Sequence, residues 1–156
     1  MPDFYPSHIF GMHDRGAEHL QRQKNRRGWV LVTEGIGADP NNYSGSNYTD
    51  LASQGFGVIV RLNNGYGSAG TIPHSSQYDA FAVRCGNFAA ASPGCHIWII
   101  GNEMNLAAER PGGPQGQAIT PQLYASCFRK CRAQIRSRQG HGEDQVVVGA
   151  VGPWNI

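Results

Sequence analysis

Residues 96–105 read His-Ile-Trp-Ile-Ile-Gly-Asn-Glu-Met-Asn, and the first half of this stretch is a nearly uninterrupted apolar run. Continuous rather than alternating hydrophobicity over a short run is typical of a strand that is buried on both faces, and such strands belong to parallel sheets. Because Gly101, Asn102 and Glu103 follow the run directly, the sequence predicts a carboxamide and a carboxylate at the C-terminal edge of a parallel sheet.

Four more segments of this kind lie along the chain, each followed by a turn rich in Gly or Asn, at residues 8–12, 29–33, 57–62 and 146–150. Helical patterns occupy the intervals between the five predicted strands, at residues 13–24, 47–53, 75–91 and 120–138. The last is the clearest, since Thr120 can cap its N-terminus, Pro121 suits its first position and Gly140 ends it. The alternation of strand and helix predicts an α/β fold with a parallel sheet, in a single domain over residues 1–156.

The composition excludes several classes of protein. With 156 residues, a net charge of +2 and 40% hydrophobic residues, the chain suits one folded domain rather than a disordered segment. Its apolar runs are too short to cross a bilayer and its first residues do not read as a signal peptide, so we expect a cytoplasmic protein without a membrane partner. The basic run at residues 22–27 is interpreted as the solvated end of a helix, which predicts no nucleic-acid partner.

The cysteines and histidines do not predict a metal site. The six histidines form no His-x-His or His-Glu-x-x-His pattern, and no Cys-x-x-Cys pair occurs among the four cysteines, which are Cys85, Cys95, Cys127 and Cys131. We therefore expect free thiols, buried or at the surface, with no metal and no cofactor. His96 opens the fourth predicted strand, at the opposite end from Glu103, and is interpreted as structural.

The strand followed by Gly101-Asn102-Glu103 resembles the glycoside hydrolases of clan A, whose fold is a (β/α)8 barrel. In that family an Asn-Glu pair at the end of the fourth strand supplies the general acid/base. The resemblance implies that Glu103 is the acid/base and that Asn102 contacts the sugar beside it. Glu103 also follows the fourth strand of this chain, and glycoside hydrolysis needs a carboxylic acid that protonates the leaving oxygen.

Side chains at the ends of the other predicted strands could bind the same carbohydrate substrate. They are His13 and Asp14 after the first strand, Glu34 after the second, Arg61 and Asn63 at the third, and Trp154 and Asn155 after the fifth. The polar groups would orient sugar hydroxyls, and Trp154 would stack on a sugar ring.

The family pattern is incomplete in this chain. A clan A barrel has eight strands and a nucleophilic Glu at the end of the seventh, whereas this chain stops after the fifth. Glu109 and Glu143 follow Glu103, but neither is placed as a strand-seven nucleophile. We therefore expect a truncated barrel that is inactive alone and that self-associates or pairs with a missing C-terminal half-barrel, because an incomplete barrel exposes strand edges and an apolar face.

Two alternatives remain. One is a non-catalytic barrel fragment that binds carbohydrate. The other is a nucleotide-binding α/β protein that uses the Gly-rich loop Gly65–Gly70. This loop matches G-x-G-x-x-G in letters, but the next predicted helix begins only at residue 75, and no acidic residue lies at the distance at which a dinucleotide fold binds ribose.

Overall fold

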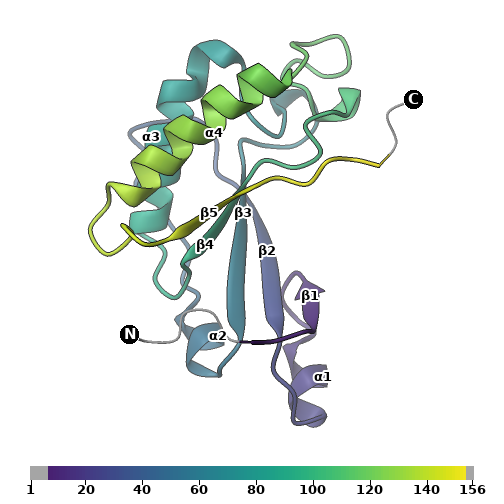
Figure 1. Cartoon of the computed structure of the whole chain (residues 1–156), viewed down its shortest axis with the longest axis vertical. Coiled ribbons are helices and arrows are strands. Elements are labelled where there is room, and N and C mark those ends of the chain that lie inside the picture. Colours follow the sequence, from purple (N-terminus) through teal and green to yellow (C-terminus); the bar gives the residue numbers. More distant parts are fainter. Residues whose placement is uncertain (1–6, 154–156) are drawn as a thin grey trace.

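The computed structural model describes residues 7–153, which form an α/β fold around one five-stranded, all-parallel sheet (Figure 1). The strands pair in sequential order and are β1 (Gly11–His13), β2 (Trp29–Gly35), β3 (Gly57–Asn63), β4 (Ile97–Ile100) and β5 (Gln145–Val148). The predicted α/β fold with a parallel sheet is thereby confirmed. β1 and β5 are the two edges of the described sheet, so a closed barrel is not formed by these residues.

Four α-helices lie between the strands in the predicted order: α1 (Glu18–Gln23), α2 (Thr49–Ser53), α3 (Tyr78–Ala90) and α4 (Pro121–Arg136). Three short 3-10 turns, η1 (Gly67–Ala69), η2 (Ser75–Gln77) and η3 (Ala107–Glu109), lie in the loops after β3 and β4. α4 begins as predicted, with the Thr120 hydroxyl accepting a hydrogen bond from the Leu123 amide at 3.2 Å.

The first helix is shorter than the predicted 13–24. Asp14 and Gly16 have positive φ angles of 65° and 110°, so the chain turns sharply after β1 before α1 can start. β1 is likewise shifted toward the C-terminus relative to the predicted 8–12. β5 ends at Val148 instead of residue 150, because the next amide, that of Gly149, donates to the Tyr124 hydroxyl.

The main core lies between one face of the sheet and the pair α3 and α4, which cover that face together in Figure 1. Trp98 of β4 is fully buried there and meets Phe88 of α3 edge to face. Each large apolar side chain buried in this layer contributes about 1.5–3 kcal/mol relative to exposure. All four cysteines are unpaired, as expected, and all are buried.

The opposite face of the sheet carries the alternate residues of each strand. Leu31, Ile59, Arg61 and Ile99 belong to it, and all four are half-buried. Among these four, Arg61 and Ile99 stand nearest the C-terminal edge, and Arg61 lies beside Thr33 of β2 and Ile99 of β4.

None of the helices in residues 7–153 combines the length and the hydrophobicity that crossing a membrane requires.

Candidate functional site

Glu103 lies directly beyond β4 in a backbone conformation that a non-glycine residue rarely adopts. Its φ angle is 46°, and Gly101 two residues earlier has a φ of 71°. The Glu103 amide donates to the Ala150 carbonyl at 2.8 Å, while its own carbonyl accepts from the Leu106 amide at 2.8 Å. Left-handed backbone at a non-glycine residue costs free energy and concentrates at functional sites, where the surrounding structure holds it in place.

Asn102 and Asn63 are joined through a buried hydroxyl. The Asn102 amide donates to Thr71 Oγ1 at 2.6 Å, and that hydroxyl donates to Asn63 Oδ1 at 3.2 Å. Thr71 is completely buried and Asn63 nearly so. Asn63 therefore supports the loop that carries Asn102 and Glu103, a contact that the sequence prediction of a sugar-binding Asn63 did not anticipate.

Glu109 brings a second carboxylate to the same loop, in the 3-10 turn η3. Its pKa is raised above the ordinary value, first because the side chain is partly buried and second because the negative charge of Glu103 is close, while the positive charge of Arg61 opposes the rise. Glu103, Glu109 and Arg61 thus form one electrostatically coupled group. The sequence offered only one signal for Glu109, its position in the loop after the Asn-Glu pair.

The guanidinium of Arg61 is incompletely paired. Its Nη1 lies 3.5 Å from Thr33 Oγ1, a long contact, and its Nε is buried without a hydrogen-bond partner among residues 7–153. Buried donors of this kind are uncommon in folded proteins. A positively charged group with an unused donor beside two carboxylates is suited to binding an oxygen-rich ligand.

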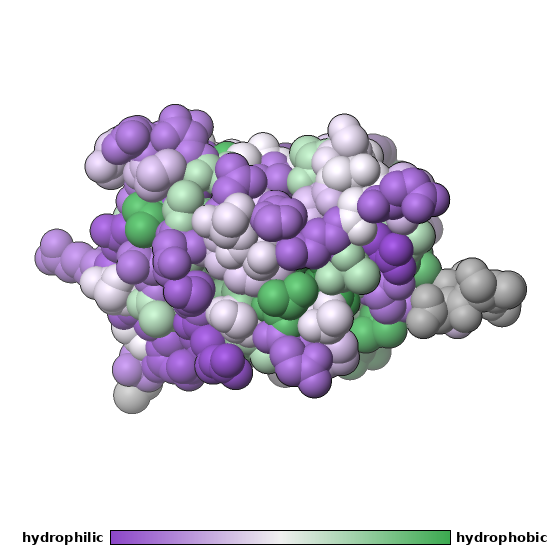
Figure 2. Space-filling view, turned by 90° about the horizontal axis from the view of Figure 1, so that it is seen from above, coloured by the Kyte–Doolittle hydropathy of each residue, from purple (hydrophilic) through white to green (hydrophobic). Residues whose placement is uncertain are grey.

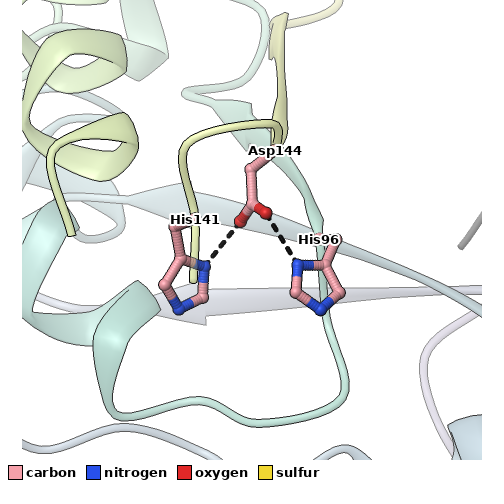
Figure 3. Close-up of side chains that lie close together, drawn as sticks. All are labelled: His96, His141 and Asp144. Carbon is pink, nitrogen blue, oxygen red and sulfur yellow. Dashed lines mark hydrogen bonds and ion pairs between the residues drawn. The ribbon is translucent and has the colours of Figure 1, made fainter. Parts of the chain in front are cut away.

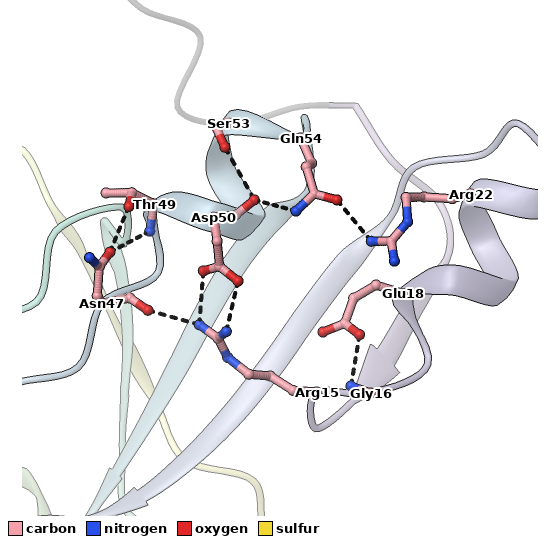
Figure 4. A network of polar contacts seen from close by, with 9 residues as sticks. All are labelled: Arg15, Gly16, Glu18, Arg22, Asn47, Thr49, Asp50, Ser53 and Gln54. Atoms are coloured by element: carbon pink, nitrogen blue, oxygen red, sulfur yellow. Dashed lines mark hydrogen bonds and ion pairs between the residues drawn. The ribbon is translucent and has the colours of Figure 1, made fainter.

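His13 and Asp14 are not brought to this group. His13 Nδ1 contacts Asp14 Oδ2 at 2.9 Å, and both side chains are exposed at the edge strand β1. β1 is three strand spacings, about 14 Å, from β4 across the sheet. The segment after β1 instead contacts α2 through the ion pair of Arg15 with Asp50 at 2.9 Å (Figure 4).

Glu34 also lies apart from Glu103, because it shares a face with Val30 and Val32, the face that α3 and α4 cover. Its Oε1 accepts from the Tyr48 hydroxyl at 2.7 Å and from the Ser46 hydroxyl at 3.1 Å. These contacts tie the loop after β2 to the sheet.

The predicted residues Trp154 and Asn155 lie outside the described part of the chain.

A cavity of about 670 Å³ opens among the loops that follow β2, β3 and β4. Polar groups make up much of its wall, and its lining residues are Ala38, Asp39, Asn64, Ser68, Ala69, His74, Gln77, Pro111 and Gly112. Its volume falls in the range of small-molecule sites.

On the face of the molecule seen in Figure 2, hydrophilic residues dominate and hydrophobic ones form small separate patches.

Part of the Gly65–Gly70 loop lines this cavity, but the helix that follows the loop starts only at Tyr78. The dinucleotide fingerprint requires a helix that opens within the glycines, so that its N-terminus meets the pyrophosphate. The nucleotide-binding alternative therefore lacks its main structural element here.

A separate cluster of ionisable side chains lies at the other end of the sheet. His96 precedes β4, as expected, and its Nδ1 contacts Asp144 Oδ1 at 2.7 Å. His141 Nδ1 contacts Asp144 Oδ2, also at 2.7 Å. Sequence analysis did not identify this cluster, because His96 is far along the chain from His141 and Asp144 and the three match no spacing pattern.

No protein-family model matches the chain, and a search of curated proteins gives no significant match.

Proposed function

We propose that the C-terminal edge of the sheet binds a carbohydrate and that Glu103 acts there as the general acid/base of a glycosidase-like site. One observation carries the proposal: Glu103 stands in a strained backbone conformation at the end of β4, electrostatically coupled to Glu109. Arg61 and Asn102 would hold sugar hydroxyls beside it.

A second carboxylate close to Glu103 supports the proposal, because the charge of Glu103 contributes to the raised pKa of Glu109. A glycosidase needs one carboxylic acid that donates a proton to the leaving oxygen and one carboxylate that acts as nucleophile or base. In the proposed site Glu103 faces the scissile oxygen, and Glu109 is the second carboxylate.

Carbohydrate binding without hydrolysis is the second candidate function. The observation that favours it is the cavity at the ends of β2, β3 and β4, whose lining includes Asn64, His74 and Gln77 but not Glu103. A ligand held there would contact amide and imidazole groups without reaching the carboxylate pair.

With Glu109 as the second carboxylate, the proposal requires this chain to hydrolyse glycosides by itself, in contrast to the expectation of a fragment that is inactive alone. The test compares Glu103→Gln with the wild-type protein on aryl glycosides that carry good or poor leaving groups. We expect hydrolysis of the poor leaving groups to fall about 100-fold or more, because they need the proton, while good leaving groups react at nearly the wild-type rate. Glu143→Gln serves as the control, since this glutamate is fully exposed beyond the other end of the sheet.

The outcomes separate the two candidates. Equal rates for Glu103→Gln and the wild type on both substrates would remove Glu103 from the mechanism. Saccharide binding in calorimetry without any hydrolysis would favour the binding protein, and neither binding nor hydrolysis across a panel of saccharides would contradict both.

A further inference from the structure

We propose that His96, His141 and Asp144 form a binding site for a divalent transition-metal ion of the Zn²⁺ type at the N-terminal edge of β4 and β5. Each residue offers one ligand atom, and the three atoms lie within 4.8 Å of one another. The site is at the opposite end of the sheet from Glu103, so the inference is independent of the proposed carbohydrate function.

The fold brings the three side chains together from two separate segments. His96 stands immediately before β4, whereas His141 and Asp144 lie in the turn between α4 and β5. Figure 3 shows the two imidazoles approaching the same carboxylate from either side. The backbone fixes this arrangement, because the Gln145 amide donates to the His96 carbonyl at 2.9 Å and the Asp144 amide to the His141 carbonyl at 3.1 Å.

The chemistry of the set suits zinc. Imidazole nitrogen and carboxylate oxygen are its common ligands, at about 2.0–2.2 Å from the ion. In a tetrahedral complex such ligand atoms are about 3.3 Å apart, against the 2.7 Å of the two imidazole–carboxylate hydrogen bonds. Binding an ion therefore requires each Nδ1 to move about 0.6 Å away from the Asp144 oxygen that it contacts, with each ring proton on Nε2 and each Nδ1 lone pair directed at the metal.

The residues around the three side chains also favour metal binding. The Trp98 indole donates to Asp144 Oδ2 at 2.6 Å and so orients the carboxylate, as outer hydrogen bonds do around metal ligands. Asp144 is 2% exposed at its side chain and His141 11%, whereas His96 is 26% exposed and leaves an approach for an ion and for a fourth, water ligand.

A cluster that only stabilises the fold would show the same hydrogen bonds. The experiment must therefore distinguish a structural hydrogen-bonded cluster from a metal-binding site. His96→Gln does so, because glutamine keeps an N–H donor toward Asp144 but is a poor zinc ligand. His74→Gln is the matched control, since His74 is exposed and lies at the cavity beyond the C-terminal edge. Untagged protein, stripped with a chelator, is titrated with ZnCl₂ by calorimetry and followed by thermal unfolding.

We expect one Zn²⁺ per chain, a dissociation constant in the micromolar range or tighter, and a Tm that rises with Zn²⁺ but not with Mg²⁺. His96→Gln should weaken Zn²⁺ binding at least about 10-fold while its metal-free Tm stays near that of the wild type. His74→Gln should bind as the wild type does. Absence of Zn²⁺ binding to the folded wild type, or equal affinity in His96→Gln, would overturn the proposal.

Discussion

At the scale of single residues, the buried Tyr78 and the half-buried Tyr124 show how a hydroxyl group can either support or weaken the fold. The Tyr124 hydroxyl donates to the Ile100 carbonyl at 2.8 Å and accepts from the Gly149 amide at 2.7 Å. The Tyr78 hydroxyl is buried without a partner among residues 7–153. Removing the oxygen should therefore have opposite consequences at the two positions.

We expect Tyr124→Phe to lower the free energy of unfolding by about 1–3 kcal/mol, because it leaves a buried carbonyl and a buried amide unpaired. Tyr78→Phe should leave that free energy unchanged or raise it by about 1 kcal/mol, since it removes a buried hydroxyl that gives up its hydrogen bonds to water on folding and gains none from residues 7–153 in the folded protein. Urea denaturation of both variants measures the difference, and each is the control of the other. Equal effects would contradict the hydrogen-bond assignment.

The same two phenols predict instability in alkali. Burial raises the pKa of Tyr78 and of Tyr124 from 10.0 to about 12. Between these two pH values the unfolded chain releases protons that the folded chain keeps, so the free energy of unfolding falls as the pH rises from about 10 to about 12. Denaturation at pH 9 and pH 11 measures the loss, which should be smaller in Tyr78→Phe. An equal loss in that variant would mean that Tyr78 ionises normally in the fold.

The candidate site could be predicted from the sequence only where one strand sets the position. Asn102 and Glu103 follow a recognisable strand, and their place at its end comes from local pattern alone. The coupling of Glu103 to Glu109 depends on how the loop folds back. The contact of His96 with Asp144 joins residues 48 apart in the chain. Neither contact leaves a spacing pattern that a sequence could reveal.

At the scale of elements, α3 and α4 approach each other closely at Gly86. A β-carbon on this residue would lie 2.9 Å from the Gln134 carbonyl oxygen and 2.8 Å from Arg138 Nε. The carbonyl belongs to the α4 backbone and cannot rotate away, so glycine is what allows the two helices to pack at this distance.

Gly86→Ala should consequently destabilise the protein by about 1–3 kcal/mol through overpacking, although the same change at an open helix position stabilises by about 0.5–1 kcal/mol. Thermal or urea unfolding gives the sign directly. Gly86→Val should lose more than Gly86→Ala, because its side chain is larger. A stabilising Gly86→Ala would show that α4 moves aside freely.

The order of the elements followed from the sequence, but several of their ends did not. Apolar runs and helical periodicity locate strands and helices because burial requires them. The start of α1 depends on the left-handed turn at Asp14 and Gly16, and Asp14 is not a residue type that marks such a turn uniquely. The end of β5 depends on the distant Tyr124 hydroxyl.

At the scale of the whole molecule, the described sheet has two edges and a second, half-buried face. The edge strand β5 exposes apolar side chains, with Val147 38% and Val148 59% exposed, and Val151 just beyond it is 72% exposed. A groove of about 500 Å³ runs beside this strand against α4. Unpaired strand edges with apolar side chains favour pairing with another chain.

We expect self-association through β5, with a second copy of the chain as the partner. Sedimentation velocity over a range of protein concentrations should show species larger than the 16.9 kDa chain. Val148→Lys should shift the distribution toward monomer, because it places a charge on the edge. Tyr43→Lys, at an exposed aromatic residue in the loop before α2, should leave association unchanged. A monomer at all concentrations would contradict this expectation.

The loop that carries Glu103 is joined to the chain beyond β5 by more than one bond. Besides the bond from Glu103 to Ala150, the Asn105 side chain accepts from the Gly152 amide at 2.8 Å and donates to the Gly152 carbonyl at 2.9 Å. These three hydrogen bonds tie the two segments to each other. A displacement of residues 150–152 would therefore also move Glu103. The position of this segment consequently influences the direction in which the Glu103 carboxylate points.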